Sequence, residues 1–405
     1  MTFFLIGLFT NAQEANDGQK VKIYRNGQVT YQLTMDSITV AETSGPVIPG
    51  KTTYVVLYDY DEEKKSISYK LFVNGVETQL KVPGSDSDYQ ICSVEEHNGD
   101  IYILGYRSFK DDRGWGTYNH EYVVWKNMEY QYSTVDYNIT TPLNESLMID
   151  GKDIYILLSA EKPDDIGTIN EATAYRMYMK NQENAVFVSR KFDINNGELY
   201  EVNDVKRYGS YHSTNAWWEY VSVWRLTHND EVTYLQNVDL SKTYSSEMIK
   251  VHKGKPYIVG CVKTMYSTGI DPNPFEYSYT ALIYNGVTTI EYPEYHNVFR
   301  VAFDSHDNIY LLCVDIDRKI SILKNGTLQY KLAESEDWHY DSSTLNSPGF
   351  FIENNDVYVL YRTILADNQG EHVSYGRLWK NGELIWKAEN KWCFIIDIAI
   401  TNPTK

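Results

Sequence analysis

One short phrase recurs eight times along this chain of 405 residues and constrains its fold more than any other feature. The phrase is usually a large apolar residue, one variable residue and Asn, and Gly follows the Asn in five copies. The repeated residues are Asn26, Asn74, Asn127, Asn181, Asn229, Asn285, Asn325 and Asn381. Repetition at a period of about 50 residues predicts small units that bury their apolar faces only by packing against one another.

The unit over residues 298–332 shows what one repeat contains. Apolar and other residues alternate over 299–303, which predicts a strand, and Ile309–Val314 is apolar on both faces, which predicts a buried strand. A third strand begins at Ile320 and ends at Asn325-Gly326, a pair typical of a tight hairpin turn, and a fourth strand follows. Each unit is therefore predicted to be four antiparallel strands, here called a, b, c and d.

Strand b carries a second signature, a Tyr shortly after a polar turn. The matching residues are Tyr54, Tyr102, Tyr155, Tyr257, Tyr310 and Tyr358. In the fourth unit either Tyr200 or Tyr208 could fill the position, and in the fifth Pro256 replaces the apolar residue that precedes the Tyr. The chain has 36 Tyr, and aromatic residues favour strands, so composition also indicates an all-β protein.

Four-stranded units in series at this period resemble the β-propeller superfamily, and the a-to-d order resembles its WD40-like arrangement. The Trp-Lys-Asn-Gly type of hairpin resembles that of secreted bacterial propeller repeat proteins of unassigned function. The resemblance covers about residues 20–400 and implies a fold, but no chemistry. The WD dipeptide, the kelch double glycine and the sialidase Asp box are absent.

The two ends of the chain predict how the ring closes. Complete units are expected at 36–82, 89–135, 146–190, 194–240, 246–292, 297–333 and 350–390, with a lone hairpin at 22–33 before them and a lone strand at 393–400 after them. Joining these ends would give a composite eighth blade and remove a free sheet edge. Eight blades is our prediction, and seven blades plus an accessory hairpin is the alternative.

The spacing between the two signatures predicts where the blades differ. From the hairpin Asn to the next strand-b Tyr the spacing is 28 residues in four cases, whereas from that Tyr to the next Asn it varies from 15 to 28. We assign the variation to loops between strands b and c, which leave a propeller on the same face as the d–a loops. Long loops on a rigid scaffold carry binding residues.

The predicted site consists of aromatic residues on this face, which could stack on sugar rings or anchor a protein. They are Trp115, Tyr118, Trp217, Trp218, Trp338, Tyr340 and Trp392. The alternative is that these side chains pack among themselves. We find no catalytic motif and assign no catalytic or metal-binding residue. No cofactor is expected; calcium is conceivable because several loops carry Asp, but no ligand spacing supports it.

The net charge, the cysteine spacing and the amino-terminal residues limit which classes of partner and location are possible for this protein. The net charge of −18, without a basic stripe, argues against a nucleic-acid partner, and no apolar run is long enough for membrane insertion. The four cysteines have no metal-ligand spacing, and we expect buried thiols. Residues 1–12 read as a signal peptide that lacks its basic start, followed by one propeller domain over 13–405. We therefore expect a secreted, periplasmic or cell-surface protein.

Two hypotheses follow. In the first, the protein is a non-catalytic propeller that binds a glycan or a protein partner through its long-loop face. In the second, it is a carbohydrate-active hydrolase or lyase with carboxylates at the central channel, since propeller active sites draw residues from several blades and leave no local motif. The first is preferred, and the sequence predicts no oligomeric state.

Overall fold

The structure is a computed structural model in which the chain forms two units, Met1–Ser44 and Gly45–Lys405. It describes residues 20–25, 28–34, 45–61, 64–85, 88–110, 118–136, 146–151, 153–160, 174–179, 186–188, 191–212, 217–229, 231–236, 241–267, 275–315, 319–332, 349–366, 372–388 and 393–402. The end of the predicted signal peptide at residue 12 lies outside these ranges. Among the described residues no helix could span a membrane.

The second unit contains seven four-stranded antiparallel sheets. Blade 1 is β30 (Phe394–Thr401), β3 (Thr52–Asp61), β4 (Ser66–Val73) and β5 (Val76–Thr78); blade 2 is β6 (Gln90–His97), β7 (Asp100–Lys110), β8 (Tyr118–Lys126) and β9 (Glu129–Asp136); blade 3 is β10 (Ser146–Asp150), β11 (Asp153–Ala160), β12 (Ala174–Met179) and β13 (Val186–Val188). Blade 4 is β14 (Phe192–Asn195), β15 (Glu198–His212), β16 (Trp217–His228) and β17 (Glu231–Tyr234); blade 5 is β18 (Lys242–His252), β19 (Lys255–Ser267), β20 (Phe275–Tyr284) and β21 (Thr289–Tyr292). Blade 6 is β22 (Tyr295–Phe303), β23 (Ile309–Asp315), β24 (Ile320–Lys324) and β25 (Thr327–Lys331); blade 7 is β26 (Phe350–Glu353), β27 (Asp356–Ala366), β28 (His372–Lys380) and β29 (Glu383–Lys387).

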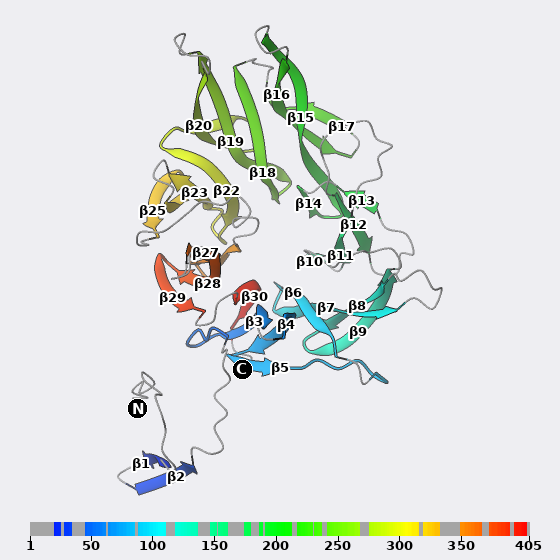
Figure 1. The fold of residues 1–405 in the computed structure, drawn as a ribbon, viewed down its shortest axis with the longest axis vertical. Coiled ribbons are helices and arrows are strands. Elements are labelled where there is room, and N and C mark those ends of the chain that lie inside the picture. Colours follow the sequence, from blue (N-terminus) through cyan, green and yellow to red (C-terminus); the bar gives the residue numbers. More distant parts are fainter. Residues whose placement is uncertain are drawn as a thin grey trace. The chain divides into compact units, whose positions relative to one another are not determined.

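These sheets are the blades of a β-propeller, because each packs on the next and the seventh packs on the first. A separate cluster of buried apolar residues lies at every one of the seven blade-to-blade junctions. At the junction of blades 7 and 1, for example, Tyr358 and Leu360 pack with Val55 and Ile398. The first strand of each blade is the inner one, and Figure 1 shows β30 beside both β3 and β6. The all-β propeller prediction is confirmed.

The prediction for the closing blade was wrong. β30 pairs with β3 over seven residue pairs, from Thr52 opposite Thr401 to Tyr58 opposite Phe394. The carboxyl-terminal strand is therefore strand a of the blade that begins at Thr52, and it does not join the hairpin at 22–33. That hairpin, β1 (Lys20–Arg25) and β2 (Gln28–Thr34), forms a two-stranded sheet of its own. The arrangement matches the alternative of seven blades plus an accessory hairpin.

The repeated Asn does more than form a turn. Asn74 and Gly75 have φ angles of 50° and 79°, and Asn381 and Gly382 have 51° and 83°, as a two-residue hairpin turn requires. The Asn side chain also reaches across the blade to the start of strand b. Asn74 Oδ1 accepts a hydrogen bond from the Thr53 amide at 2.9 Å, and the Asn74 amide donates to the Thr53 carbonyl at 2.9 Å.

We call this pair of hydrogen bonds the Asn clasp. The same clasp joins Asn127 to Ile101, Asn325 to Ile309 and Asn381 to Val357. Asn127 Nδ2 also donates to Asp100 at 2.8 Å. In each of these four cases the residue that follows the clasped amide is the strand-b Tyr, which explains why the two signatures recur together. Both signatures therefore hold the blade together.

Blade 5 shows what happens when the clasp has no donor. Pro256 occupies the position of Thr53 and Ile101 and has no amide hydrogen to donate. Asn285 instead accepts hydrogen bonds from the Val287 and Thr288 amides at 3.2 and 3.0 Å, and its φ angle is not positive. In blade 4, Tyr200 lies opposite His228, immediately before Asn229, so Tyr200 and not Tyr208 is the strand-b Tyr.

Candidate functional site

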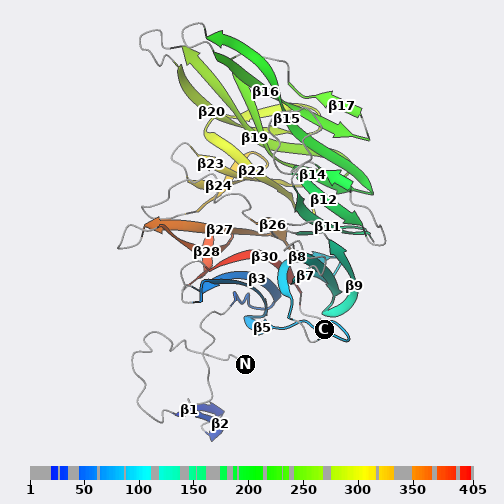
Figure 2. The same ribbon diagram turned by 45° about the vertical axis from the view of Figure 1, so that its right-hand side comes forward.

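The two ends of the blades differ in construction. At one end, strands a and b and strands c and d are joined by tight turns such as Asn98-Gly99 and Asn381-Gly382. At the other end strands b and c form hairpins, and several of these are long: β15 has 15 residues and β19 has 13, whereas β23 has 7. Figure 2 shows the long β-ribbons of blades 4 and 5. We call this end, where the b–c hairpins lie, the hairpin face.

We predicted that the length variation lies in loops between strands b and c, but among the described residues the strands themselves differ in length. We expected b–c loops at 107–121, 159–173, 208–220, 263–279 and 362–374. In four of them the described residues are mostly paired strand, with Arg107 opposite Glu121 and Lys263 opposite Tyr279, and almost all of 159–173 lies outside the described residues. The b and c strands continue beyond the common length and pair with each other, which satisfies their backbone groups. The described part of this face is made of β-ribbons.

The structure leaves most of the predicted site residues untested. Trp115, Trp338, Tyr340 and Trp392 lie outside the described residues. Tyr118 begins β8, and Trp217 and Trp218 begin β16, where they pair with His212 and Tyr211. These three therefore lie at the hairpin face by their backbone position, and their side chains belong to the part of the chain that is not described.

Two exposed aromatic residues of the hairpin face were missed. Phe109, on β7, is 37% exposed, and Tyr279, on β20, is 42% exposed with its ring centroid 5.9 Å from that of His296. Both fall in segments that we interpreted as loops. Phe109 and Tyr279 could have been predicted as exposed if their segments had been assigned as strands, because every second side chain of a β-ribbon points outward.

The base of the blade 2 hairpin is held by a charged cluster. Arg107 Nε donates to Glu121 Oε2 at 2.5 Å, and the Tyr89 hydroxyl donates to the same oxygen at 3.2 Å. The Arg107 guanidinium lies over the Tyr89 ring, 5.6 Å from its centroid. Next along the ribbon, Ser108 and His120 Nδ1 are 2.9 Å apart. These contacts fix the ribbon to its blade, so the Phe109 side chain is carried by an ordered scaffold.

A second polar group, here called the axial cluster, lies on the inner strands. It consists of Glu95 on β6, Asp193 on β14, Lys250 on β18 and Asp397 on β30, from four different blades. Lys250 Nζ is 3.3 Å from Asp193 Oδ1. Asp397 Oδ2 accepts hydrogen bonds from Ser93 Oγ at 2.8 Å and from the Val94 amide at 3.0 Å, which ties the closing strand to blade 2.

The environment of the axial cluster favours protonated carboxyl groups. Burial raises the pKa of Glu95 to about 8; Lys250 opposes this rise, and the charges of Asp397 and Asp193 add to it. Burial also raises the pKa of Asp397 to about 6, against the hydrogen bonds from Val94, Ser93 and Ile398. Two carboxyls that titrate near neutrality and act on each other could exchange a proton with a bound molecule.

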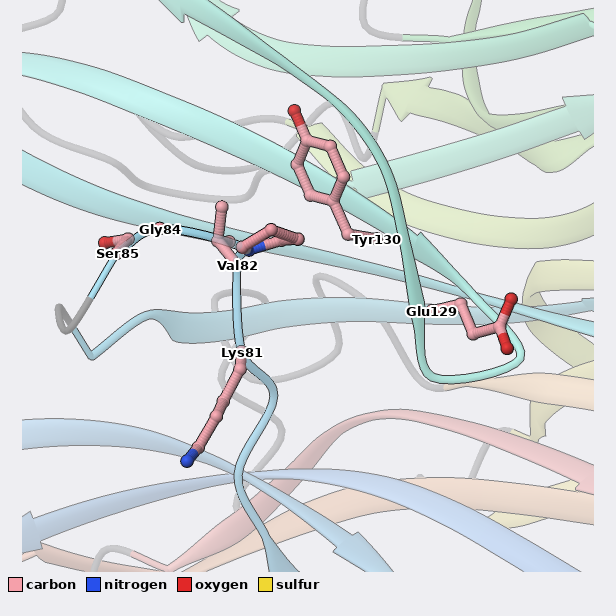
Figure 3. Close-up of a pocket in the computed structure, with 7 residues that line it drawn as sticks. Lys81, Val82, Gly84, Ser85, Glu129 and Tyr130 are labelled. Atoms are coloured by element: carbon pink, nitrogen blue, oxygen red, sulfur yellow. The ribbon is translucent and has the colours of Figure 1, made fainter.

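No metal centre is found in the described part of the chain. No group of three or more His, Cys, Asp or Glu side chains there is arranged to hold a metal ion. The four cysteines are buried thiols, and none of them forms a disulfide. An open depression of about 640 Å³ lies between the β5–β6 connection and the start of β9, lined by Lys81–Ser85, Glu129 and Tyr130. Figure 3 shows that their side chains point in different directions, and none belongs to the predicted site.

Comparisons with known proteins find only distant structural likenesses, and the fold assignment depends on the sheets and their packing described above. No family model and no curated protein matches the chain. Among solved structures, the β-propeller domain of the Trilobed protease from Pyrococcus furiosus is 11% identical, with a TM-score of 0.45 over 84% of this chain and 93% of that one. A Trypanosoma rangeli sialidase mutant is 7% identical, with a TM-score of 0.25 over 96% of this chain and 59% of that one. A mannose phosphorylase from Leishmania mexicana is 11% identical, with a TM-score of 0.26 over 62% of this chain and 90% of that one.

Proposed function

We propose that this protein is a non-catalytic, exported propeller that binds a glycan or a protein partner on its hairpin face. The observation that carries the proposal is the difference between the two ends of the blades. Long, paired ribbons occupy one end, while short turns such as Asn381-Gly382 occupy the other. Ribbons that are held to their blades present side chains with little loss of conformational freedom on binding.

Exposed aromatic residues on the ribbons support this function. Phe109 and Tyr279 lie on blades 2 and 5, and the backbones of Tyr118, Trp217 and Trp218 lie on blades 2 and 4. Aromatic side chains provide flat apolar faces for sugar rings and large contact areas for proteins. The free cysteines do not conflict with export, because each is buried in the core of a blade.

A matched pair of tyrosine variants tests the proposal. Tyr279 on the hairpin face is 42% exposed, and Tyr234 on outer strand β17 is 48% exposed, so the two differ in location far more than in exposure. The protein is first screened on a glycan array and by crosslinking pull-down. Tyr279→Ala, Phe109→Ala and Trp217→Ala should each weaken the captured interaction about tenfold or more, as for anchor residues, while Tyr234→Ala leaves it unchanged. Equal loss with Tyr234→Ala would contradict a hairpin-face site.

The axial cluster supports a second candidate, hydrolysis or elimination on a carbohydrate. Glu95 and Asp397 have raised pKa values and belong to different blades, as an acid and a base assembled by the fold would. Glu95→Gln and Asp397→Asn should then each abolish turnover of a carbohydrate substrate found by activity screening while leaving hairpin-face binding intact. Turnover that survives both substitutions would exclude these groups.

A further inference from the structure

Asn-Gly sequences are chemically labile, and in this fold their Asn side chains differ in how they are held by hydrogen bonds. In such a pair, the Gly amide nitrogen can attack the Asn side-chain carbonyl carbon. The new N–C bond closes a succinimide, and the C–Nδ2 bond breaks to release ammonia. Water then opens the ring at either carbonyl and leaves Asp or isoaspartate. The reaction requires a side chain that is free to turn toward the next amide nitrogen.

The clasped Asn side chains are not free to turn. Asn325 Oδ1 accepts from the Ile309 amide at 2.9 Å, and its Nδ2 donates to Asn308 at 2.8 Å. Asn381 Oδ1 accepts from the Val357 amide at 2.8 Å, and its Nδ2 donates to Asp356 at 2.7 Å. Attack by the following Gly would break both hydrogen bonds and leave the strand-b amide without an acceptor.

Asn98-Gly99, in the turn between β6 and β7, is built differently. Both residues are exposed, with φ angles of 54° and 86°. Within the described part of the chain, no hydrogen bond holds the Asn98 side chain. The Gly99 amide, which is the attacking group, donates to Glu96 Oε1 at 2.5 Å. A carboxylate in this position can accept the amide proton as the new bond forms.

We propose that Asn98 deamidates in the folded protein faster than the clasped Asn325 and Asn381, with Glu96 as the base that takes the Gly99 proton. The proton passes to the departing nitrogen, so that ammonia leaves and the carboxylate is restored. Isoaspartate at this position lengthens the backbone of the turn and adds a carboxylate beside Glu96. Asn325 and Asn381, in the same dipeptide and with φ angles of 49° and 51°, are the protected counterparts.

The experiment follows three sites in one sample. The full chain is held folded at mildly alkaline pH in isotopically labelled water, and peptide mapping by mass spectrometry measures label at Asn98, Asn325 and Asn381. Modification of Asn98 should be severalfold faster than at the two clasped sites, and the three rates should converge in urea. Equal rates in the folded protein would overturn the proposal.

Glu96→Gln tests the role of the carboxylate, because glutamine keeps the acceptor but is not a base. The variant should slow modification at Asn98 severalfold and leave the slow rates at Asn325 and Asn381 unchanged. An unchanged rate at Asn98 would remove Glu96 from the reaction. Circular dichroism of both proteins before incubation ensures that the folded states are compared.

Discussion

At the scale of single residues, the Asn clasp explains why the sequence repeats so regularly. The turn alone accounts for the Asn-Gly pair, but Asn127 is followed by Met128, which has a φ angle of 70°, and the clasp is still made. Its Oδ1 satisfies the Ile101 amide, so an Asn-to-Ala change removes both a turn former and an acceptor. Sequence reading predicted the turn. It did not predict the clasp, because the amide on the far strand belongs to a residue 26 positions earlier.

We expect Asn127→Ala to lower the free energy of unfolding by about 2–3 kcal/mol. The substitution leaves the Ile101 amide without an acceptor and forces Ala into a positive φ angle. Asn285→Ala is the matched control: its side chain bonds only exposed amides of its own turn, and we expect a loss below about 1 kcal/mol. Urea denaturation of the two variants measures the difference. Equal losses would mean that the cross-strand bond contributes nothing.

At the scale of elements, the inner strands carry bulges that the sequence did not reveal. In β18, the register shifts between Ser246 and Met248, and the backbone there presses against Gly260 of β19. A Cβ at Gly260 would lie 2.0 Å from the Ser245 carbonyl oxygen. Nothing in the sequence distinguishes Gly260 from its apolar neighbours, because a close approach between backbones leaves no periodic pattern.

Gly260→Ala should therefore lower the free energy of unfolding more than a substitution at a glycine that has a positive φ angle but no close neighbours. We expect a loss of about 3 kcal/mol or more, since the bulge must move. Gly254→Ala provides the comparison, because Gly254 has a φ angle of 74° and nothing within 4 Å of the added Cβ. Its expected loss is about 1 kcal/mol. Thermal unfolding followed by circular dichroism ranks the two, and the reverse order would contradict the close packing.

The ribbons of the hairpin face contradict our assumption that strand length is nearly constant among the blades. The variable spacing identified the correct end of the blades, but we assumed that strands do not change length freely. Strand b ranges from 7 residues in β23 to 15 in β15. Antiparallel pairs can lengthen two residues at a time without changing the core of the blade. Of the candidate aromatic residues, the backbones of Tyr118, Trp217 and Trp218 lie on these ribbons, while Phe109 and Tyr279 were missed because their segments were assigned as loops.

At the scale of the whole molecule, closure decides which end of the chain is essential. β30 is strand a of blade 1, and it packs Ile398 and Ile400 against blade 7. Removing residues 393–405 should expose the edge of β3 and cause aggregation or non-cooperative unfolding. Removing residues 1–44 should leave the seven-bladed ring folded, because every blade junction is formed by residues after 44.

Size-exclusion chromatography and calorimetry of the two truncated proteins check this prediction. An eight-bladed ring closed through residues 22–33 would require both ends, so loss of cooperative unfolding on removal of residues 1–44 would contradict seven blades. The sequence predicted that a strand near residue 400 closes the ring. The partner of this strand could not be predicted from the sequence, because β2 and β3 both contain apolar residues against which it could pack.

The axial cluster gives the ring a dependence on pH whose sign follows from its pKa values. Glu95 has a pKa of about 8 in the folded protein, above the ordinary value of 4.5, so between these values the folded state holds a proton that the unfolded chain has lost. Stability contributed by this group is therefore complete below pH 4.5 and declines as the pH rises to about 8. Asp397 adds a decline in the same direction between its ordinary value of 3.8 and about 6.

Glu95→Gln replaces the carboxyl with a neutral group of the same shape that keeps an acceptor for the Ile149 amide. The variant should be more stable than the natural protein at mildly alkaline pH, by several degrees in Tm, and about equal to it near pH 4.5. Glu129→Gln, at the outer turn of blade 2, should not change the pH profile. A profile unchanged by Glu95→Gln would mean that burial and the charges of Asp397 and Asp193 do not raise the pKa of Glu95 in the folded protein.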